Sequence, residues 1–260
     1  MKPRDLIRLA LTPSDLMARL ELERVRKRPR YTEGTTRLFG KPLKYIDSSS
    51  YYFLHEEIFK EEVYRFDTKR AKPRIIDGGA NIGLSVIYFK KNFPNSRITA
   101  FEADPKIALV CKENLISHGI HDVEVHSKAL WSKETELSFH QEGADGGKLV
   151  SSAEKHTKIL AVPLAQYIDE PIDFLKLDIE GAEWDVLNSC RKELKSVDKL
   201  FVEYHSFADQ PQILSELLEL LRSSGFRIFI TTPSIFSPTP LVEIKSYAGF
   251  DMVLNIIGTR

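Results

Sequence analysis

The sequence is poor in cysteine and contains no long apolar run. Its two cysteines, Cys111 and Cys190, provide no disulfide framework, which makes a reducing compartment the default expectation. No stretch approaches the ~20 apolar residues of a membrane-spanning helix, and the N-terminus lacks the apolar core of a secretory signal. We therefore expect a cytoplasmic protein without a membrane span.

The sequence also lacks an excess of charge of either sign. Lys and Arg together number 37, as do Asp and Glu, so the formal net charge is zero. Proteins dedicated to nucleic-acid binding are usually basic, so we expect no nucleic-acid partner. Apolar residues make up 42% and charged residues 28% of the 260 residues, which is typical of a globular chain that can form one large α/β domain.

The N-terminal region differs from the rest of the chain. Leu16, Leu20 and Val25 follow a helical spacing, with Ser14 as N-cap, and a basic cluster follows at residues 24–30. Two interpretations of this cluster stay open: a solvated helix face, or a contact with an anionic substrate or a membrane surface.

Aromatic residues are frequent between residues 45 and 66, where they could pack a helix onto the core or line a pocket. We therefore divide the chain into a helical, basic N-terminal appendage at 1–45 and an α/β domain at 46–260.

From residue 73 onward, short apolar segments alternate with helical patterns. This alternation predicts a mostly parallel sheet with helices on both faces, whose ligands bind beyond the carboxyl ends of the strands. The predicted strands lie within 73–78, 97–105, 123–130, 135–140, 159–164, 173–179, 199–206, 226–231 and 250–258, and the predicted helices within 83–93, 105–119, 182–194 and 211–225.

A glycine-rich turn lies between the first of these strands and the helix that follows. Glycine lets the backbone approach a ligand, and a helix N-terminus offers free N–H groups. The next strand ends in Glu102, at the position where an acid accepts both hydroxyls of a ribose in dinucleotide-binding folds. The residues predicted to bind a cofactor here are Asp77, Gly78, Gly79, Ala80, Asn81, Gly83, Glu102 and Ala103.

Two observations favour S-adenosylmethionine as this cofactor. Asp77 stands at the mouth of the turn, where it would repel a pyrophosphate and attract a sulfonium or ammonium group. The turn is also short for a loop around two phosphates. An NAD-dependent oxidoreductase remains an alternative, because Gly78-x-Ala80-x-x-Gly83 is a loose relative of the dehydrogenase fingerprint. A non-catalytic cofactor-binding partner protein is a third interpretation.

Candidate catalytic residues follow two later strands. Side chains alternate along a strand, so Lys176 shares a face with Asp178, which predicts an ion pair, and Glu203 shares a face with His205. Methyl transfer to a hydroxyl requires removal of a proton. His205 is the candidate base, oriented by Glu203 or Asp178, and a hydrogen-bonded structural histidine is the alternative. No set of three converging metal ligands is visible, so we expect no metal.

Two further acids stand near the start of the helix that follows Asp178. We expect Glu180 to be favoured there by the helix dipole. Glu183 is open to two interpretations, a surface acid that stabilises the dipole or a substrate contact.

Two segments, IDGGANIG (76–83) and LKLDIEGAEWDVL (175–187), resemble the FkbM family of S-adenosylmethionine-dependent methyltransferases, and the resemblance extends over about residues 58 to 205. It implies a class I (Rossmann-like) α/β fold, with a seven-stranded, mostly parallel sheet, helices on both faces and a reversed last strand. Here a short helical N-terminal appendage would precede it. The resemblance also implies that Asp77, Gly79, Asn81, Glu102 and Asp178 hold the cofactor, while Ala129 and Leu130 border the adenine.

The same resemblance implies O-methylation of a hydroxyl on a sugar, a glycan or another small metabolite. The acceptor pocket would be built by residues 45–66, 141–156 and 231–248, which contain no recognisable specificity code. The partner expected is therefore a small-molecule or glycan acceptor. The sequence leaves the oligomeric state open, a homo-oligomer included.

Overall fold

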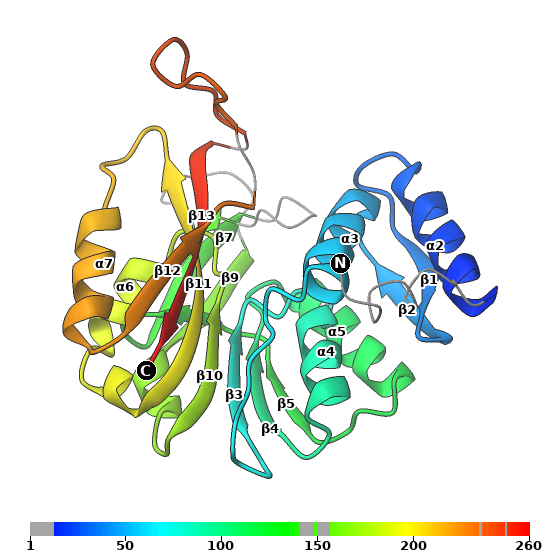
Figure 1. Ribbon diagram of the computed structural model, residues 1–260, viewed down its shortest axis with the longest axis horizontal. Helices are drawn as coiled ribbons and strands as arrows, with labels where there is room; N and C mark the ends of the chain where they lie inside the picture. Colours follow the sequence, from blue (N-terminus) through cyan, green and yellow to red (C-terminus); the bar gives the residue numbers. More distant parts are fainter. Residues whose placement is uncertain (1–12, 141–147, 150–156, 234–235, 248) are drawn as a thin grey trace, which may run out of the picture.

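The protein is described by a computed structural model that covers residues 13–140, 148–149, 157–233, 236–247 and 249–260. Its centre is a seven-stranded sheet in the order β12-β13-β11-β10-β3-β4-β5 (Figure 1). Strand β13 runs antiparallel to its two neighbours, β11 and β12, and the other pairings in this sheet are parallel. The predicted class I sheet with a reversed last strand is confirmed. Its strands are β3 (Arg74–Gly78), β4 (Arg97–Phe101), β5 (Val123–His126), β10 (Ile172–Leu177), β11 (Val197–Phe207), β12 (Arg227–Thr231) and β13 (Phe250–Thr259).

Helices cover both faces of this sheet, as predicted. Helices α4 (Leu84–Asn92) and α5 (Pro105–Ser117) lie on one side, and α6 (Glu183–Ser189) and α7 (Leu214–Ser223) lie on the other (Figure 1). Because both faces are covered, every residue of the central strand β10 is buried. The predicted helix at 182–194 is shorter than expected, since α6 ends at Ser189 and a 3₁₀ turn, η4 (Glu193–Ser196), follows.

The predicted strand at 123–130 is divided between two sheets, so the prediction of one strand was wrong. The chain leaves the central sheet after His126, and its next strand pairs in parallel with β9 instead of β4. This second sheet has the order β6-β9-β7-β8. It contains β6 (Ala129–Trp131), β7 (Thr135–His140), β8 (Lys148–Leu149) and β9 (Thr157–Pro163), after which comes the 3₁₀ turn η3 (Leu164–Tyr167). Of the predicted loop at 141–156, residues 141–147 and 150–156 lie outside the described residues.

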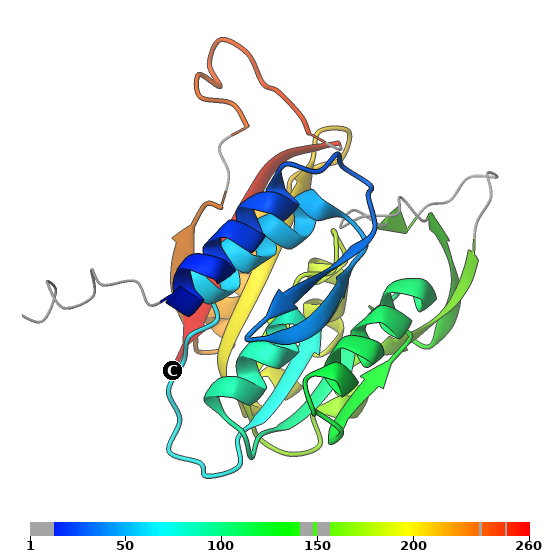
Figure 2. The same ribbon diagram turned by 90° about the vertical axis from the view of Figure 1, so that its right-hand side faces the viewer.

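The N-terminal region folds onto the α4–α5 side. Its helix α2 lies beside α3 (Figure 2). The predicted apolar face of α2 is confirmed at Val25, which is buried, and wrong at Leu16 and Leu20, which are exposed. Leu22 is buried instead. The side chain of Ser14 lies outside the described residues. The elements of this region are α2 (Pro13–Arg26), the hairpin β1 (Gly34–Leu38) and β2 (Lys41–Tyr45), α3 (Ser48–His55) and a π-helical turn, η2 (Glu56–Lys60).

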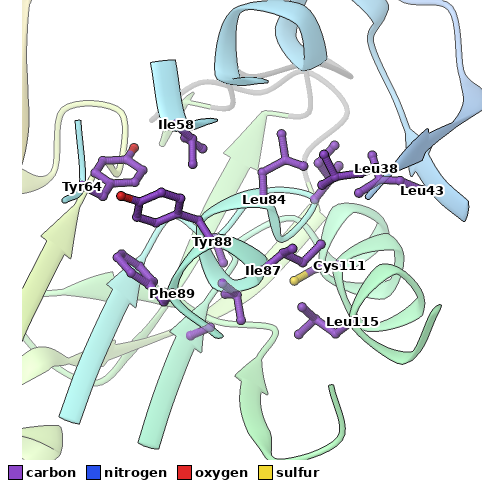
Figure 3. Close-up of a cluster of buried hydrophobic side chains, with 14 of the residues drawn as sticks. Leu38, Leu43, Ile58, Tyr64, Leu84, Ile87, Tyr88, Phe89, Cys111 and Leu115 are labelled. Atoms are coloured by element: carbon purple, nitrogen blue, oxygen red, sulfur yellow. The ribbon is translucent and has the colours of Figure 1, made fainter. Parts of the chain in front are cut away.

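One buried apolar cluster joins this region to the sheet. Leu38 and Leu43 of the hairpin and Ile58 of η2 belong to the same cluster as Leu84 of α4 and Cys111 of α5 (Figure 3). Burying apolar surface stabilises the structure by roughly 25 cal/mol per Å², so this cluster fixes the hairpin against α5 and η2 against α4.

Two sequence-based expectations concern the cysteines and the membrane. Cys111 and Cys190 are both buried and free, which agrees with the absence of a disulfide framework. In the part of the chain that the structure describes, no helix is long and apolar enough to cross a membrane.

Candidate functional site

A cavity of about 1460 Å³ opens at the carboxyl-end edge of the central sheet. Residues that follow or end four adjacent strands line it, which is where ligands bind in this type of sheet. Asp77, Gly78 and Gly83 are predicted site residues that do not line the cavity. The predicted residues that do line it are Gly79, Ala80, Asn81, Glu102, Ala103, Ala129, Leu130, Lys176, Asp178, Glu203 and His205.

Gly79 allows the loop after β3 to touch the end of β10. Its φ of +85° is a left-handed conformation that glycine adopts readily. A Cβ atom at this position would lie 1.8 Å from the backbone oxygen of Asp178, which is far inside van der Waals contact. The requirement for glycine at position 79 is therefore steric as well as conformational.

The backbone N–H groups of the loop from Gly79 to Gly83 all donate hydrogen bonds within the protein. Gly79 and Ala80 both donate to the carbonyl of Phe101, and Gly83 donates to the carbonyl of Ala80. The N–H of Asn81 donates to Glu102 and that of Ile82 to the side chain of Asn81. Because these five N–H groups already have acceptors, they are not available to a pyrophosphate, which argues against the dinucleotide interpretation.

Glu102, directly after β4, is held in place by backbone donors. Its Oε2 accepts from the N–H of Asn81 at 2.9 Å, and its Oε1 accepts from the N–H of Asp104 at 2.9 Å. Burial raises the pKa of Glu102 to about 7, although the two N–H groups oppose this shift. The carboxyl group is thus oriented toward the cavity before any ligand binds.

Lys176 is a buried cation behind the glycine loop. Its Nζ lies 3.3 Å from Asp77 Oδ1 and 3.4 Å from Asp178 Oδ2, and it donates to the carbonyl of Gly79 at 2.7 Å. Burial would lower the pKa of Lys176, but the carboxylates of Asp77 and Asp178 hold it above its ordinary value. The predicted ion pair between Lys176 and Asp178 is confirmed.

Asp77 lies behind the loop, in contrast to its predicted place at the mouth. Its side chain is fully buried, accepts from Ser85 Oγ at 2.5 Å and faces Lys176. The charge of Asp77 is therefore balanced by Lys176 and does not face the cavity. This geometry gives no support to the predicted direct contact with a sulfonium group.

Asp178, directly after β10, and Glu203, on β11, are hydrogen-bonded neighbours. Burial and the Asp178 charge raise the pKa of Glu203 well above its ordinary value. For Asp178, burial is outweighed by the charges of Lys176 and His205, so its pKa is lowered. Glu203 therefore holds a proton more strongly than Asp178 does.

His205 faces three carboxylates. Its Nδ1 lies 3.1 Å from Glu183 Oε1, while its Nε2 lies 3.6 Å from Glu180 Oε2 and 3.6 Å from Glu203 Oε2. Burial lowers the pKa of His205, but Glu180, Glu183 and Glu203 together raise it well above its ordinary value. A ring that keeps its proton is a poor base, so this environment argues against the predicted role of His205 as a base in the metal-free protein.

Glu183 is the site residue that the sequence prediction missed. It is 1% exposed, and its Oε1 accepts from the N–H groups of Ile179 and Gly181 as well as facing His205. Both predicted interpretations, a surface acid and a substrate contact, were wrong. The available signal was the four-residue spacing to Ile179, since a side chain in the first helical turn can reach back to the backbone N–H groups before it.

The chain is similar to known methyltransferases. Residues 77–228 match the model of the methyltransferase FkbM domain. Methyltransferase 1 of Beauveria bassiana is 26% identical over 224 residues, covering 75% of this chain and 87% of that protein. The 31-O-demethyl-FK506 methyltransferase FkbM of Streptomyces tacrolimicus is 23% identical, covering 80% of this chain and 94% of that protein.

A solved structure shares the fold. The methyltransferase FkbM of Methylobacillus flagellatus KT superposes with a TM-score of 0.51 at 18% identity, covering 76% of this chain and 46% of that one. The family match extends over more than half of the 260 residues. The chain belongs to the family of FkbM-domain methyltransferases.

Proposed function

We propose that this protein transfers the methyl group of S-adenosylmethionine to a hydroxyl oxygen of a sugar, a glycan or another small metabolite. The observation that carries the proposal is Glu102, a cavity-facing carboxyl group fixed by two backbone N–H groups at the end of β4. An ionised carboxylate in that place can accept both hydroxyls of the single ribose of S-adenosylmethionine.

The donor would bind along the edge formed by β3, β4 and β6. Ala129 and Leu130 line the cavity beyond Glu102 and provide an apolar border for the adenine. Gly79 and Asp178 lie on the opposite side of Glu102, toward β10, and would contact the methionine portion. The ionised Asp178 carboxylate offers a partner for the ammonium or sulfonium charge of the donor.

The acceptor would bind beside Asp178, Glu203 and His205, which we call the acid–histidine cluster. Its oxygen would attack the methyl carbon in line with the sulfur, so that a C–O bond forms while the C–S bond breaks and its electron pair stays on sulfur. The hydroxyl proton would pass to the ionised carboxylate of the Asp178–Glu203 pair. Most of the rate enhancement would come from alignment of donor and acceptor, because a sulfonium is already a good leaving group.

O-methylation and the acceptor class rest on indirect support. A family relative is named for methylation of an oxygen, 31-O-demethyl-FK506 methyltransferase, at 23% identity. The cavity, about 1460 Å³, exceeds the roughly 300–1,000 Å³ of a pocket for one small ligand, so it has room for donor and acceptor together. Aromatic rings of Phe53, Phe236 and Tyr247 and the polar groups of Glu57 and Asn255 line the part available to an acceptor. As part of the same proposal, the enzyme works in the cytoplasm, which the two free thiols support.

Titration calorimetry with S-adenosylhomocysteine and NAD⁺ tests the donor assignment. We expect S-adenosylhomocysteine to bind one molecule per chain and NAD⁺ to give no saturable heat. Tight binding of NAD⁺ without a response to S-adenosylhomocysteine would show that the protein is a dinucleotide enzyme instead.

Transfer of labelled methyl from S-adenosylmethionine to a panel of sugars, glycans and hydroxylated metabolites tests catalysis. The non-catalytic interpretation predicts that no acceptor is labelled although the donor binds. Labelling of an amine in preference to a hydroxyl would contradict the assignment to O-methylation.

A further inference from the structure

We propose that the acid–histidine cluster of Asp178, Glu203 and His205 is a binding site for one divalent cation, with Mn²⁺ as the representative ion. The sequence predicted no metal, because the three residues stand on two strands and their convergence cannot be read from spacing. In the structure, one ligand atom from each of the three lies within 4.8 Å of the others, and all three line the cavity. The role proposed below for the cation rests on the proposed function, but the site itself does not.

The position of His205 is the first argument for a ligand. Its side chain is 4% exposed, and its Nδ1 lies at hydrogen-bond distance from Glu183. The Nε2 atom belongs to a cavity-lining ring and has carboxylate oxygens of Glu180 and Glu203 at 3.6 Å, which is longer than a hydrogen bond. Metal-binding histidines almost always donate the other ring N–H to a carboxylate or carbonyl group in this way, which fixes the ring and exposes one nitrogen to the metal.

The support behind that ring is rigid. Glu183 is itself held by the N–H groups of Ile179 and Gly181, at 3.2 and 3.1 Å. The left-handed conformation of Glu180, with φ of +55°, brings the chain around to place these donors. Glu183 therefore acts as a positioning residue for His205 and is not itself a ligand.

The local charge is the second argument. Five carboxylates, Asp77, Asp178, Glu180, Glu183 and Glu203, form contacts with the two cationic side chains Lys176 and His205. A divalent cation bound among these carboxylates would offset this excess of negative charge. Lys176 does not block the site, because it contacts Oδ2 of Asp178 and a carboxylate has a second oxygen.

The donor set indicates the class of ion. Two carboxylates favour the harder cations and one imidazole favours first-row transition metals, and Mn²⁺ satisfies both. Three protein ligands leave coordination positions for water or for an acceptor oxygen. A cation here would hold the acceptor hydroxyl beside the donor and make it more acidic.

Mn²⁺ titration of the chelator-treated full chain, followed by the electron paramagnetic resonance of free Mn²⁺, tests the site. We expect one saturable site per chain in the wild type. Glu203→Gln and His205→Gln should each weaken the site at least ~10-fold, and Glu183→Gln about 10–100-fold through loss of ring orientation. Glu61→Gln, which changes a cavity-lining acid outside the cluster, is the matched control and should leave the Mn²⁺ affinity unchanged.

Absence of a saturable site in the folded wild type would overturn the proposal, as would equal Mn²⁺ affinity in the wild type, Glu203→Gln and His205→Gln. If a variant does not fold, the wild type still provides a test. Bound Mn²⁺ should broaden the imidazole NMR signals of His205 before those of His118, a buried histidine held by the carbonyls of Asn114 and Leu38.

Binding of S-adenosylhomocysteine is measured on the same samples. Donor binding without a Mn²⁺ site would refute the cation and leave the proposed function in place. A Mn²⁺ site without donor binding would refute the proposed function and leave the cation site in place.

Discussion

The backbone N–H of Asn81 donates to Glu102 Oε2 at 2.9 Å, so the loop after β3 orients the carboxyl group that follows β4. The loop and the acid are therefore one structural unit, although 21 positions separate them in the chain. Asn81 has a left-handed backbone conformation, with φ of +47°, and its N–H points toward the carboxyl group of Glu102. A substitution at Asn81 or at Glu102 should therefore alter the orientation of the other residue.

Replacement of Glu102 by glutamine should weaken the binding of S-adenosylhomocysteine at least ~10-fold. Hydrogen bonds to a charged group contribute about 1.5–3 kcal/mol each, and about 1.4 kcal/mol is a factor of ten in affinity. Glutamine is preferred to alanine because its carbonyl oxygen can still accept from one of the N–H groups of Asn81 and Asp104, whereas alanine would leave both without an acceptor. Calorimetry measures the change, with Glu136→Gln on the exposed surface of β7 as control. An unchanged dissociation constant would refute the contact with the ribose.

The affinity for S-adenosylhomocysteine should rise with pH up to about 7 and then level off. The pKa of Glu102 is raised to about 7 by burial, whereas ribose hydroxyls donate to the ionised form and lower it in the complex. Binding below pH 7 therefore releases a proton, and the affinity should increase by up to about tenfold per pH unit. The Glu102→Gln variant should lose this dependence, and a variant that retained it would show that another group is responsible.

The stability of the cofactor-free protein should show the opposite trend. The folded protein holds a proton on Glu102 between its ordinary pKa of 4.5 and the raised value of about 7. Since the folded state binds more protons in this range, the contribution of Glu102 to the free energy of unfolding falls as pH rises from 4.5 to 7. Urea unfolding of the wild type and Glu102→Gln at several pH values isolates this contribution, which should appear as a difference that is constant below pH 4.5, shrinks as the pH rises from 4.5 to about 7 and is constant above that.

Alanine at position 79 should be far more damaging than alanine at position 40. Both glycines have a left-handed φ, +85° and +78°, which costs a residue with a Cβ atom about 1–2 kcal/mol. At Gly79 the Cβ would also overlap the carbonyl of Asp178, whereas at Gly40 nothing lies within 4 Å. Overpacking adds about 1–3 kcal/mol, so urea unfolding should separate the two variants by that amount. Equal stability losses would mean that the loop and β10 are not in contact.

Lys176→Met should lower the free energy of unfolding by about 3–5 kcal/mol, because it leaves the buried carboxylate of Asp77 without its cation. Lys158→Met, which changes a side chain that is 78% exposed, is the control and should change stability by less than about 0.5 kcal/mol. Adding Asp77→Asn to Lys176→Met should recover part of the loss. Wild-type stability in Lys176→Met would contradict the assigned ion pair.

Alternation along strands explains why much of the site could be predicted. Lys176 on β10 shares a face with Asp178, which follows the strand directly, because the two positions differ by two residues. Glu203 and His205 on β11 share a face for the same reason. The parallel order of the strands then brings Glu102, Asp178 and Glu203 to one edge. These relationships depend on the periodicity of the strand, which is fixed by the backbone.

Other contacts depend on chain geometry that has no periodicity. The placement of Glu183 beneath His205 requires the left-handed conformations of Glu180 and Gly181, which a pattern of residue types does not specify. Asp77 was expected at the mouth of the cavity because it ends a strand, but Lys176 and Ser85 offered it partners behind the loop. The separation of β5 from β6 also cannot be read from the sequence pattern, because it depends on the pairing of β6 with β9.

The reversed strand β13 places one part of the cavity wall at a distance from the strands that lead to Gly79 and Glu102. Strands β12 and β13 are antiparallel neighbours at one edge of the sheet. The connection between them, at 232–249, therefore starts and ends at this edge, away from β3 and β4. Tyr247 and Phe236 of this connection line the cavity, and Arg30 from the N-terminal region donates to the Tyr247 hydroxyl. The length and composition of the connection can therefore vary without displacing Glu102 or Gly79. In the proposed function, changes in this connection would alter which molecule receives the methyl group, while the contacts proposed for its donor would stay the same.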